Sequence, residues 1–148
     1  MDDNKLLIKA ICLAKHYHAG QTDLSGQHYI KHPLRVAKAV IGVKEKIVAV
    51  LHDILEDTPI KEDQLKRTFS KEIVEAVRVL THRKEEQYRD YIRRIAENRL
   101  ATLVKIADLQ DNLDPRRDLG NRPEDVERRA RYQKALNFLN SQKTPRSS

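Results

Sequence analysis

The residues best suited to chemistry lie in the segment LHDILED, where His52 and Asp53 are followed by Glu56 and Asp57. If this segment is one helix, His52 and Glu56 lie one turn apart, and Asp53 and Asp57 lie one turn apart on the adjoining row. The flanking residues are apolar, which predicts a buried helix whose polar side chains need partners or a metal ion. A His-Asp pair alone is also a common hydrogen-bonded feature of helices, so the rest of the chain must decide between the two interpretations.

Two further segments supply residues of the same kind. His32 opens an expected helix, and Asp108 lies on an apolar helical face within KIADLQDN. With His52 and Asp53 they provide two imidazoles and two carboxylates, a donor set that suits a divalent ion such as Mn, Fe or Zn. Such an ion acidifies a bound water molecule and polarises a phosphoryl oxygen. The Glu56-Asp57 pair is suited to orienting or deprotonating that water.

The elements that must position these residues are helices throughout, which predicts an all-α fold. Ser70 and Asn98 are expected N-caps, and Pro115 prevents continuation of the helix that carries Asp108. No convincing pair of strands is found. We expect a compact helical bundle of about seven or eight helices. Apolar residues at helical spacing place them near residues 6–14, 34–41, 47–55, 61–68, 73–80, 91–95, 100–107 and 123–139.

The composition is that of one soluble domain. A chain of 148 residues can bury a core without disulfides. We expect the domain over residues 1–140 and a disordered tail over residues 141–148, which lack apolar anchors. No stretch approaches the ~20 apolar residues that cross a bilayer, and no signal-peptide pattern is present. These features predict a cytoplasmic protein without membrane partners.

The single cysteine and the net charge indicate less about the function than the His and Asp motifs do. Cys12 shares a helix with apolar neighbours, so we expect a buried side chain rather than a nucleophile. The formal net charge of +7 favours an anionic partner. The arginines of the second half alternate with acids at helical spacing, which is typical of a solvated face, although a few of them would attract a polyphosphate.

The order of these segments resembles the HD-domain hydrolases, specifically the (p)ppGpp pyrophosphohydrolase domain of Rel/Spo proteins and their small stand-alone relatives. The resemblance covers roughly residues 10–115 and rests on AKHYHAGQT, SGQHYIKHPLRVA, VAVLHDILEDT, LKRTFSKEIVEAV and LVKIADLQDNL. It implies an HD-domain bundle that binds Mn²⁺ and acts on a small nucleotide of the stringent response. The implied reaction removes the 3′-pyrophosphate of guanosine tetraphosphate or pentaphosphate.

The same resemblance implies a role for individual residues. His18 belongs to the H-x-G-Q motif and is assigned to supportive packing near the pocket. Apart from the resemblance, Lys105 lies three residues before Asp108, so it either pairs with that carboxylate or meets a substrate phosphate. The implied metal ligands are His32, His52, Asp53 and Asp108; the implied water-handling residues are Glu56 and Asp57; the implied nucleotide contacts are Ser25, Tyr29 and Asn112.

Several positions depart from the family pattern. Asp23 and Leu24 stand where an arginine and another polar or basic residue are usual, Asp111 replaces a histidine, and Pro115 replaces a threonine. These departures keep a second hypothesis open, a phosphohydrolase for a different nucleotide or a phosphorylated cofactor. A third hypothesis is a non-catalytic module that binds nucleotides or nucleic acid through its basic second half. The intact Glu56-Asp57 pair argues against this last hypothesis.

Overall fold

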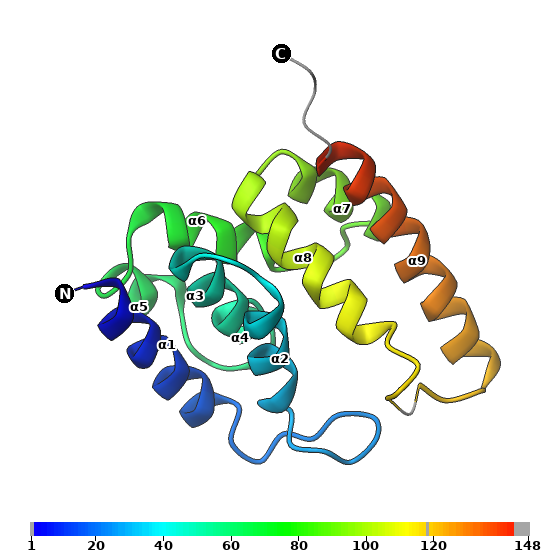
Figure 1. The fold of residues 1–148 in the computed structure, drawn as a ribbon, viewed down its shortest axis with the longest axis horizontal. Coiled ribbons are helices and arrows are strands. Elements are labelled where there is room, and N and C mark those ends of the chain that lie inside the picture. Colours follow the sequence, from blue (N-terminus) through cyan, green and yellow to red (C-terminus); the bar gives the residue numbers. More distant parts are fainter. Residues whose placement is uncertain (1, 118, 144–148) are drawn as a thin grey trace.

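A computed structural model describes residues 2–117 and 119–143. These residues contain an isolated bridge between Thr22 and His28 but no strand, so the predicted all-α bundle is confirmed (Figure 1). Nine helices occur among them, two of which, α4 and α5, have only four and five residues. The helices are α1 (Asp3–Tyr17), α2 (Lys31–Ala39), α3 (Val43–Leu51), α4 (Ile54–Asp57), α5 (Glu62–Lys66), α6 (Lys71–Leu80), α7 (Tyr88–Ala96), α8 (Arg99–Asn112) and α9 (Pro123–Lys143).

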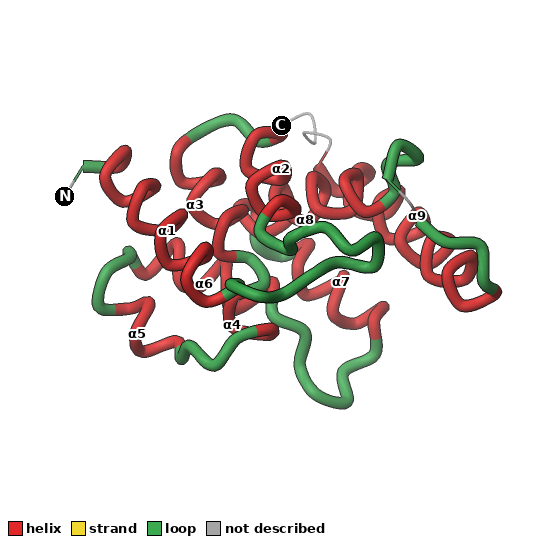
Figure 2. The backbone as a smooth tube through the Cα atoms, turned by 90° about the horizontal axis from the view of Figure 1, so that it is seen from below, coloured by secondary structure: helices red, strands yellow, loops and turns green. Residues whose placement is uncertain are grey.

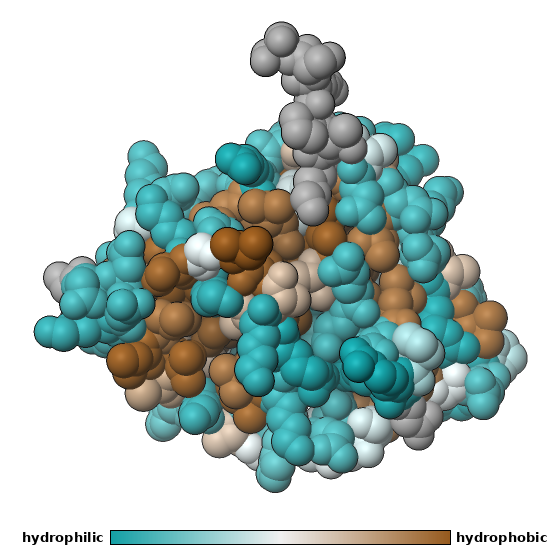
Figure 3. Space-filling view, in the orientation of Figure 1, coloured by the Kyte–Doolittle hydropathy of each residue, from teal (hydrophilic) through white to brown (hydrophobic). Residues whose placement is uncertain are grey.

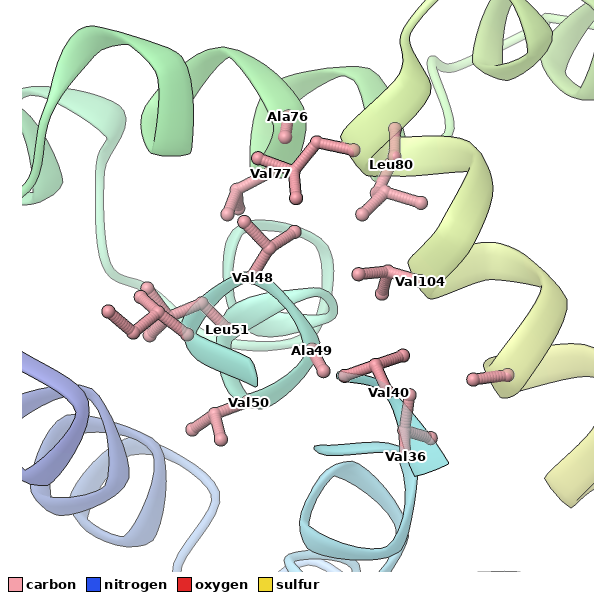
Figure 4. Close-up of a cluster of buried hydrophobic side chains, with 14 of the residues drawn as sticks. Val36, Val40, Val48, Ala49, Val50, Leu51, Ala76, Val77, Leu80 and Val104 are labelled. Carbon is pink, nitrogen blue, oxygen red and sulfur yellow. The ribbon is translucent and has the colours of Figure 1, made fainter. Parts of the chain in front are cut away.

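Helix α3 lies at the centre of the bundle. Its residues 47–51 have no exposed surface, as expected for a helix that is apolar on all sides. Figure 4 shows the side chains around it, with Val77 of α6, Val104 of α8 and Val36 of α2 surrounding α3. Helix α1 packs against α3 as well. The chain that leaves α3 therefore starts from a fixed position in the interior.

The two predicted N-caps are confirmed. Ser70 Oγ accepts a hydrogen bond from Ile73 N at 3.4 Å, and Asn98 Oδ1 accepts one from Ala101 N at 2.9 Å. These bonds satisfy backbone donors that a helix leaves free at its start. The Asn98 cap sets the beginning of α8, the helix that carries Asp108 into the interior.

Cys12 is exposed, so the prediction of a buried side chain is wrong. Helix α1 packs on the core through Ala10 and Ala14, both with no exposed surface. Two residues correspond to about 200° of rotation around a helix, which turns Cys12 away from the face that Ala10 and Ala14 share. The apolar neighbours of Cys12 in sequence therefore did not imply a shared face.

Helix α9 packs along α8 and α7 and covers one side of the bundle (Figure 1). On the face drawn in Figure 3, hydrophobic residues gather over the region of α1, α2 and α3, whereas hydrophilic residues predominate on the outer side of α9. Residues 141–143 of the predicted tail are helical, and residues 144–148 lie outside the described residues. None of the helices in the described part of the chain has the length and apolar character needed to span a membrane.

Candidate metal centre and its cavity

The segment LHDILED is not one helix, contrary to the prediction, because α3 ends at Leu51, α4 begins at Ile54, and the backbone between them departs from helical angles at Asp53, with φ −104° and ψ 1°. The His52 N–H bonds to the Ala49 carbonyl at 3.4 Å, and His52 Nδ1 lies 2.6 Å from the same oxygen. The imidazole thus occupies a carbonyl that a continuing helix would use. Consecutive side chains on a helix diverge by about 100°, but this break turns both toward one point. His52 Nε2 lies 3.1 Å from Asp53 Oδ2.

His32 from α2 and Asp108 from α8 complete the cluster. His32 Nε2 lies 2.8 Å from Asp108 Oδ1, and His52 Nε2 lies 3.3 Å from the same oxygen. Candidate ligand atoms of His32, His52 and Asp53 all lie within 4.8 Å of one another. The four residues predicted to bind metal therefore come together from α2, the turn between α3 and α4, and α8.

The hydrogen bonds made at Nδ1 leave both Nε2 lone pairs directed into the cluster. A carbonyl oxygen can only accept, so His52 Nδ1 carries the proton and Nε2 of the neutral ring does not. His32 Nδ1 lies 2.6 Å from the Asp111 carboxylate, which holds a proton on that nitrogen, while His32 Nε2 faces Asp108 Oδ1 in the cluster at 2.8 Å. Within the described residues, the buried His52 Nε2 has no hydrogen-bond partner. Nitrogen lone pairs and carboxylates that meet at one point repel one another without a cation, so the donor set fits a divalent metal ion.

The electrostatics of His52 agree with this reading. Burial disfavours its imidazolium form, yet the carboxylates of Asp53 and Asp108 raise its pKa well above the ordinary value. A buried position that favours the cationic form of a side chain is one that stabilises positive charge. The same carboxylates therefore favour a metal ion at this point.

Asp111 holds His32 in place, a role that the sequence did not reveal. Its carboxylate accepts hydrogen bonds from His32 Nδ1 and, at 2.8 Å, from Arg35 Nε. Burial opposes ionisation of Asp111, but hydrogen bonds from His32 and Arg35 hold its pKa well below the usual range. Carboxylates that bind the second nitrogen of a metal-ligating histidine fix its orientation. The available signal was the three-residue spacing from Asp108, which puts both acids on one face of α8.

Three residues predicted to contact the nucleotide bind metal-site carboxylates instead of standing free. The Tyr29 hydroxyl donates to Asp53 Oδ2. Lys105 Nζ lies 2.9 Å from Asp108 Oδ2, and Asn112 Nδ2 donates to Asp108 Oδ1 at 3.2 Å. Of the two alternatives for Lys105, the structure shows the pairing with Asp108. All three side chains also line the cavity beside the cluster, so they border both the metal site and the space for a ligand.

The two carboxylates expected to handle water line the same cavity but have different environments. Glu56 Oε1 accepts a hydrogen bond from the His82 backbone N–H at 2.8 Å, which ties the loop between α6 and α7 to α4. For Asp57, burial together with the charges of Asp53 and Glu56 raises the pKa to about 6. A carboxylate that titrates near neutrality is suited to exchange protons with water.

The cavity has a volume of about 710 Å³, within the range of small-molecule sites. Both the loop between α1 and α2 and the loop between α6 and α7 contribute residues to its lining. In Figure 2 the first of these loops crosses the front of the molecule, and the second lies below it. Ser25 lies in the first of these loops, where its hydroxyl donates to Asp23 Oδ1 at 2.8 Å. Arginines expected on a solvated face also line the cavity, together with tyrosines that the sequence did not single out. These residues are Arg117, Arg128, Arg129, Arg131, Tyr88, Tyr91 and Tyr132.

Arg117 connects the two sides of the cavity. Its guanidinium donates to Asp111 Oδ2 at 3.0 Å and to Asn112 Oδ1 at 3.1 Å, and it lies 3.4 Å from Asp23 Oδ2. The negative charge of Asp23 is thereby compensated by a cation from the segment after α8.

A family model described as the HD domain matches residues 10–131 of the chain. The chain belongs to the HD domain family. This membership implies a divalent metal ion, and the His/Asp cluster is suited to hold it.

Among its relatives, this HD domain is 32% identical over 143 residues to the bifunctional (p)ppGpp synthase/hydrolase SpoT of Escherichia coli K12. The match covers 86% of the chain and 20% of SpoT. It is also 32% identical over 132 residues to a guanosine-3′,5′-bis(diphosphate) 3′-pyrophosphohydrolase of Haemophilus influenzae, covering 79% of the chain and 19% of the relative. The chain thus spans about a fifth of the length of these proteins.

A solved structure of a metazoan ortholog of SpoT, described as hydrolysing ppGpp and acting in starvation responses, has a similar fold. The TM-score is 0.73 at 24% sequence identity, and the match covers 90% of this chain and 84% of that one. The likeness establishes the fold of this HD domain along nearly its whole length.

Proposed function

We propose that this HD domain is a Mn²⁺-dependent hydrolase that removes the 3′-pyrophosphate of ppGpp and pppGpp. The observation that carries the proposal is the convergence of two Nε2 lone pairs with the carboxylates of Asp53 and Asp108 beside a cavity of nucleotide size. Relatives named as guanosine-3′,5′-bis(diphosphate) 3′-pyrophosphohydrolases support this choice of substrate. In this proposal the working domain is residues 1–140, the partner is a small nucleotide, and the location is the cytoplasm.

The proposed roles follow from the position of each side chain. His32, His52, Asp53 and Asp108 hold the ion. When bound, the ion supplies charge for the phosphoryl group and acidifies water. Asp57, whose pKa lies near neutrality, accepts the proton of the attacking water.

Glu56 fixes the neighbouring loop, and the cavity contacts of Ser25, Tyr29, Lys105 and Asn112 orient the nucleotide. Water adds to the phosphorus attached to the 3′ oxygen, and that P–O bond breaks. For ppGpp the products are GDP and pyrophosphate.

The direct test is incubation of the purified chain with Mn²⁺ and ppGpp, with GDP and pyrophosphate both measured. Asp53→Asn should lower activity by more than ~10–100-fold, the usual cost of substituting a residue that only positions a metal ligand. The loss should be larger because Asp53 is itself a proposed ligand. Asp114→Asn is the matched control, because Asp114 pairs with Arg116 near the surface. Absence of turnover by the wild-type chain with Mn²⁺ would contradict the assignment. Parallel reactions with Mg²⁺, Zn²⁺ and Fe²⁺ test the choice of metal.

A second candidate is hydrolysis of a different nucleotide or a phosphorylated cofactor. The specific observation in its favour is Asp23, an acid on the cavity wall that pairs with Arg117. The family pattern has an arginine at the position of Asp23, so the nucleoside side of this cavity has a different charge arrangement. A panel of 3′- and 5′-phosphorylated nucleotides with Mn²⁺ separates the two candidates. Preference for a substrate other than ppGpp would favour the second.

A further inference from the structure

His18 and Gln21 connect the end of α1 to Asp57 at the end of α4 and, through Tyr29, to Asp53. Gln21 Nε2 donates to the Asp57 carbonyl at 2.9 Å, and Gln21 Oε1 lies 2.8 Å from His18 Nδ1. The His18 side chain is buried, with 2% exposure, and its ring centroid lies 5.0 Å from that of Tyr29. Tyr29 in turn donates to Asp53. The pair therefore contacts Asp57 and also Tyr29, the residue that donates a hydrogen bond to the proposed metal ligand Asp53.

The hydrogen bonds of Gln21 determine the tautomer of His18. The amide nitrogen of Gln21 must donate to the Asp57 carbonyl, so its oxygen faces His18 and requires a proton on Nδ1. Burial lowers the pKa of His18, which favours the neutral ring. A neutral ring with its proton on Nδ1 has a lone pair on Nε2. That nitrogen is buried and lacks a hydrogen-bond partner among residues 2–117 and 119–143.

We propose that His18 Nε2 accepts a hydrogen bond from a water molecule in the metal centre, and that Gln21 fixes this tautomer while it holds Asp57. The His18 ring packs on the ring of Tyr29, whose hydroxyl donates to Asp53, so His18 lies beside the cluster. An imidazole lone pair and a carboxylate are both acceptors, and a water molecule has the two hydrogens that satisfy both. His18 and Gln21 are thus positioning residues. Their role in turnover rests on the proposed hydrolase function, whereas the tautomer does not.

The tautomer is tested without any assay of activity. Long-range ¹H–¹⁵N correlation spectra of the ¹⁵N-histidine-labelled full chain, recorded with Zn²⁺ as a diamagnetic metal, distinguish protonated from unprotonated ring nitrogens. We expect His18 to show a protonated Nδ1 and an unprotonated Nε2. In Gln21→Met, which removes the acceptor for Nδ1, we expect loss of this preference. A proton on Nε2 of the wild-type chain would overturn the inference whatever the activity of the protein.

Two substitutions separate the roles of His18 and Gln21 in turnover. In His18→Asn the amide nitrogen takes the place of Nδ1 and keeps the bond to Gln21, but the acceptor at Nε2 is lost. In Gln21→Glu the acceptor for Nδ1 is kept, but the donor to the Asp57 carbonyl is lost. We expect each to lower kcat for ppGpp by about 10- to 100-fold with little change in KM. Wild-type kcat in a folded His18→Asn protein would refute the water contact, and wild-type kcat in Gln21→Glu would refute the positioning of Asp57.

Failure of the inference and failure of the proposed function give different results. If the wild-type chain does not hydrolyse ppGpp, the proposed function fails, and the spectra still decide the tautomer. If the wild-type chain turns over and His18→Asn matches it, only the inference fails. Thermal unfolding of each variant establishes that it is folded before its kinetics are compared.

Discussion

Each histidine of the metal centre is bound at Nδ1 by an oxygen, His52 by the Ala49 carbonyl and His32 by the Asp111 carboxylate. These two acceptors decide which nitrogen of each ring is available to a metal ion. They differ in kind, because a backbone carbonyl cannot be removed by a side-chain substitution whereas the Asp111 carboxylate can. The orientation of His32 is therefore the part of the metal centre that mutagenesis can test most directly.

At the scale of the residue, we predict that Asp111→Asn weakens Mn²⁺ binding by about 10- to 100-fold. The amide can still accept from His32, but it lacks the charge that pairs with Arg35 and Arg117. Calorimetric titration of the metal-free protein with Mn²⁺ measures the effect. Asp114→Asn, close to the end of the same helix, should bind Mn²⁺ like the wild type. Equal affinities of the Asp111 and Asp114 variants would contradict the assigned role of Asp111.

Helices α2 and α8 carry His32 and Asp108 to the cluster, and α3 delivers His52 and Asp53 from the centre of the core. The stability of α8 thus bears on the position of Asp108, Asn112 and Lys105 together. Helices α6 and α7 are joined by a loop that borders the cavity. Arg94 of α7 fixes this loop through bonds to the Val79 and Thr81 carbonyls and to Glu86.

At the scale of the element, we predict that Asn98→Ala lowers the free energy of unfolding by about 1 kcal/mol, because it removes the N-cap of α8. Denaturant unfolding measures the change. Asn98→Asp retains an oxygen acceptor and should remain within a few tenths of a kcal/mol of the wild type. The Mn²⁺ affinity of the folded Asn98→Ala protein should be unchanged, since Asn98 is remote from the metal donors in sequence and lies at the opposite end of α8 from Asn112. A loss in Asn98→Asp equal to that in Asn98→Ala would contradict the capping role.

The ion pair between Glu86 and Arg94 should make stability depend on pH. Hydrogen bonds from Arg94 lower the pKa of Glu86 from its ordinary 4.5 to about 2. A depressed pKa means that the pair contributes fully above pH 4.5 and that its contribution is lost as the pH falls toward 2. We expect the difference in unfolding free energy between wild type and Glu86→Gln to shrink over this interval. A difference that stays constant from neutral pH to pH 2.5 would refute the linkage.

The whole molecule assembles one site from segments that are far apart in the sequence. His32 and Asp108 are 76 residues apart, yet their side chains lie 2.8 Å apart in the fold. An unfolded chain does not hold such a site, so a metal ion that binds here binds the native state preferentially. Metal occupancy and global stability are therefore linked.

At the scale of the molecule, we predict that Mn²⁺ raises the free energy of unfolding, by about 2.7 kcal/mol when the free ion is at ~100 times its Kd. Thermal unfolding with Mn²⁺ and after chelation measures this difference. Asp53→Asn should show a much smaller shift at the same Mn²⁺ concentration. An unfolding midpoint that does not respond to Mn²⁺ in the wild-type chain would contradict the metal centre.

Much of this architecture could be predicted from the sequence because helical periodicity is a local signal. The helices near Ser70 and Asn98 were expected with their caps, and the donors His32, His52, Asp53 and Asp108 were expected to meet. The interruption of the helix at Asp53 was not expected, because it accompanies a contact of the His52 side chain with the Ala49 carbonyl that periodicity does not encode. The roles of Asp111 and the cavity arginines depend on how α8, α9 and the first loop pack, which periodicity does not encode.

The break after Leu51 also has a consequence for the thermodynamics of metal binding. His52 and Asp53 are consecutive residues, so together they act as a bidentate chelator whose bite is set by one peptide unit. Once one donor binds, the other is present at a high effective concentration. Since the core holds α3 rigidly, little conformational entropy remains to be lost when the second bond forms. Replacing either residue of this dipeptide would therefore remove the chelate effect together with one donor.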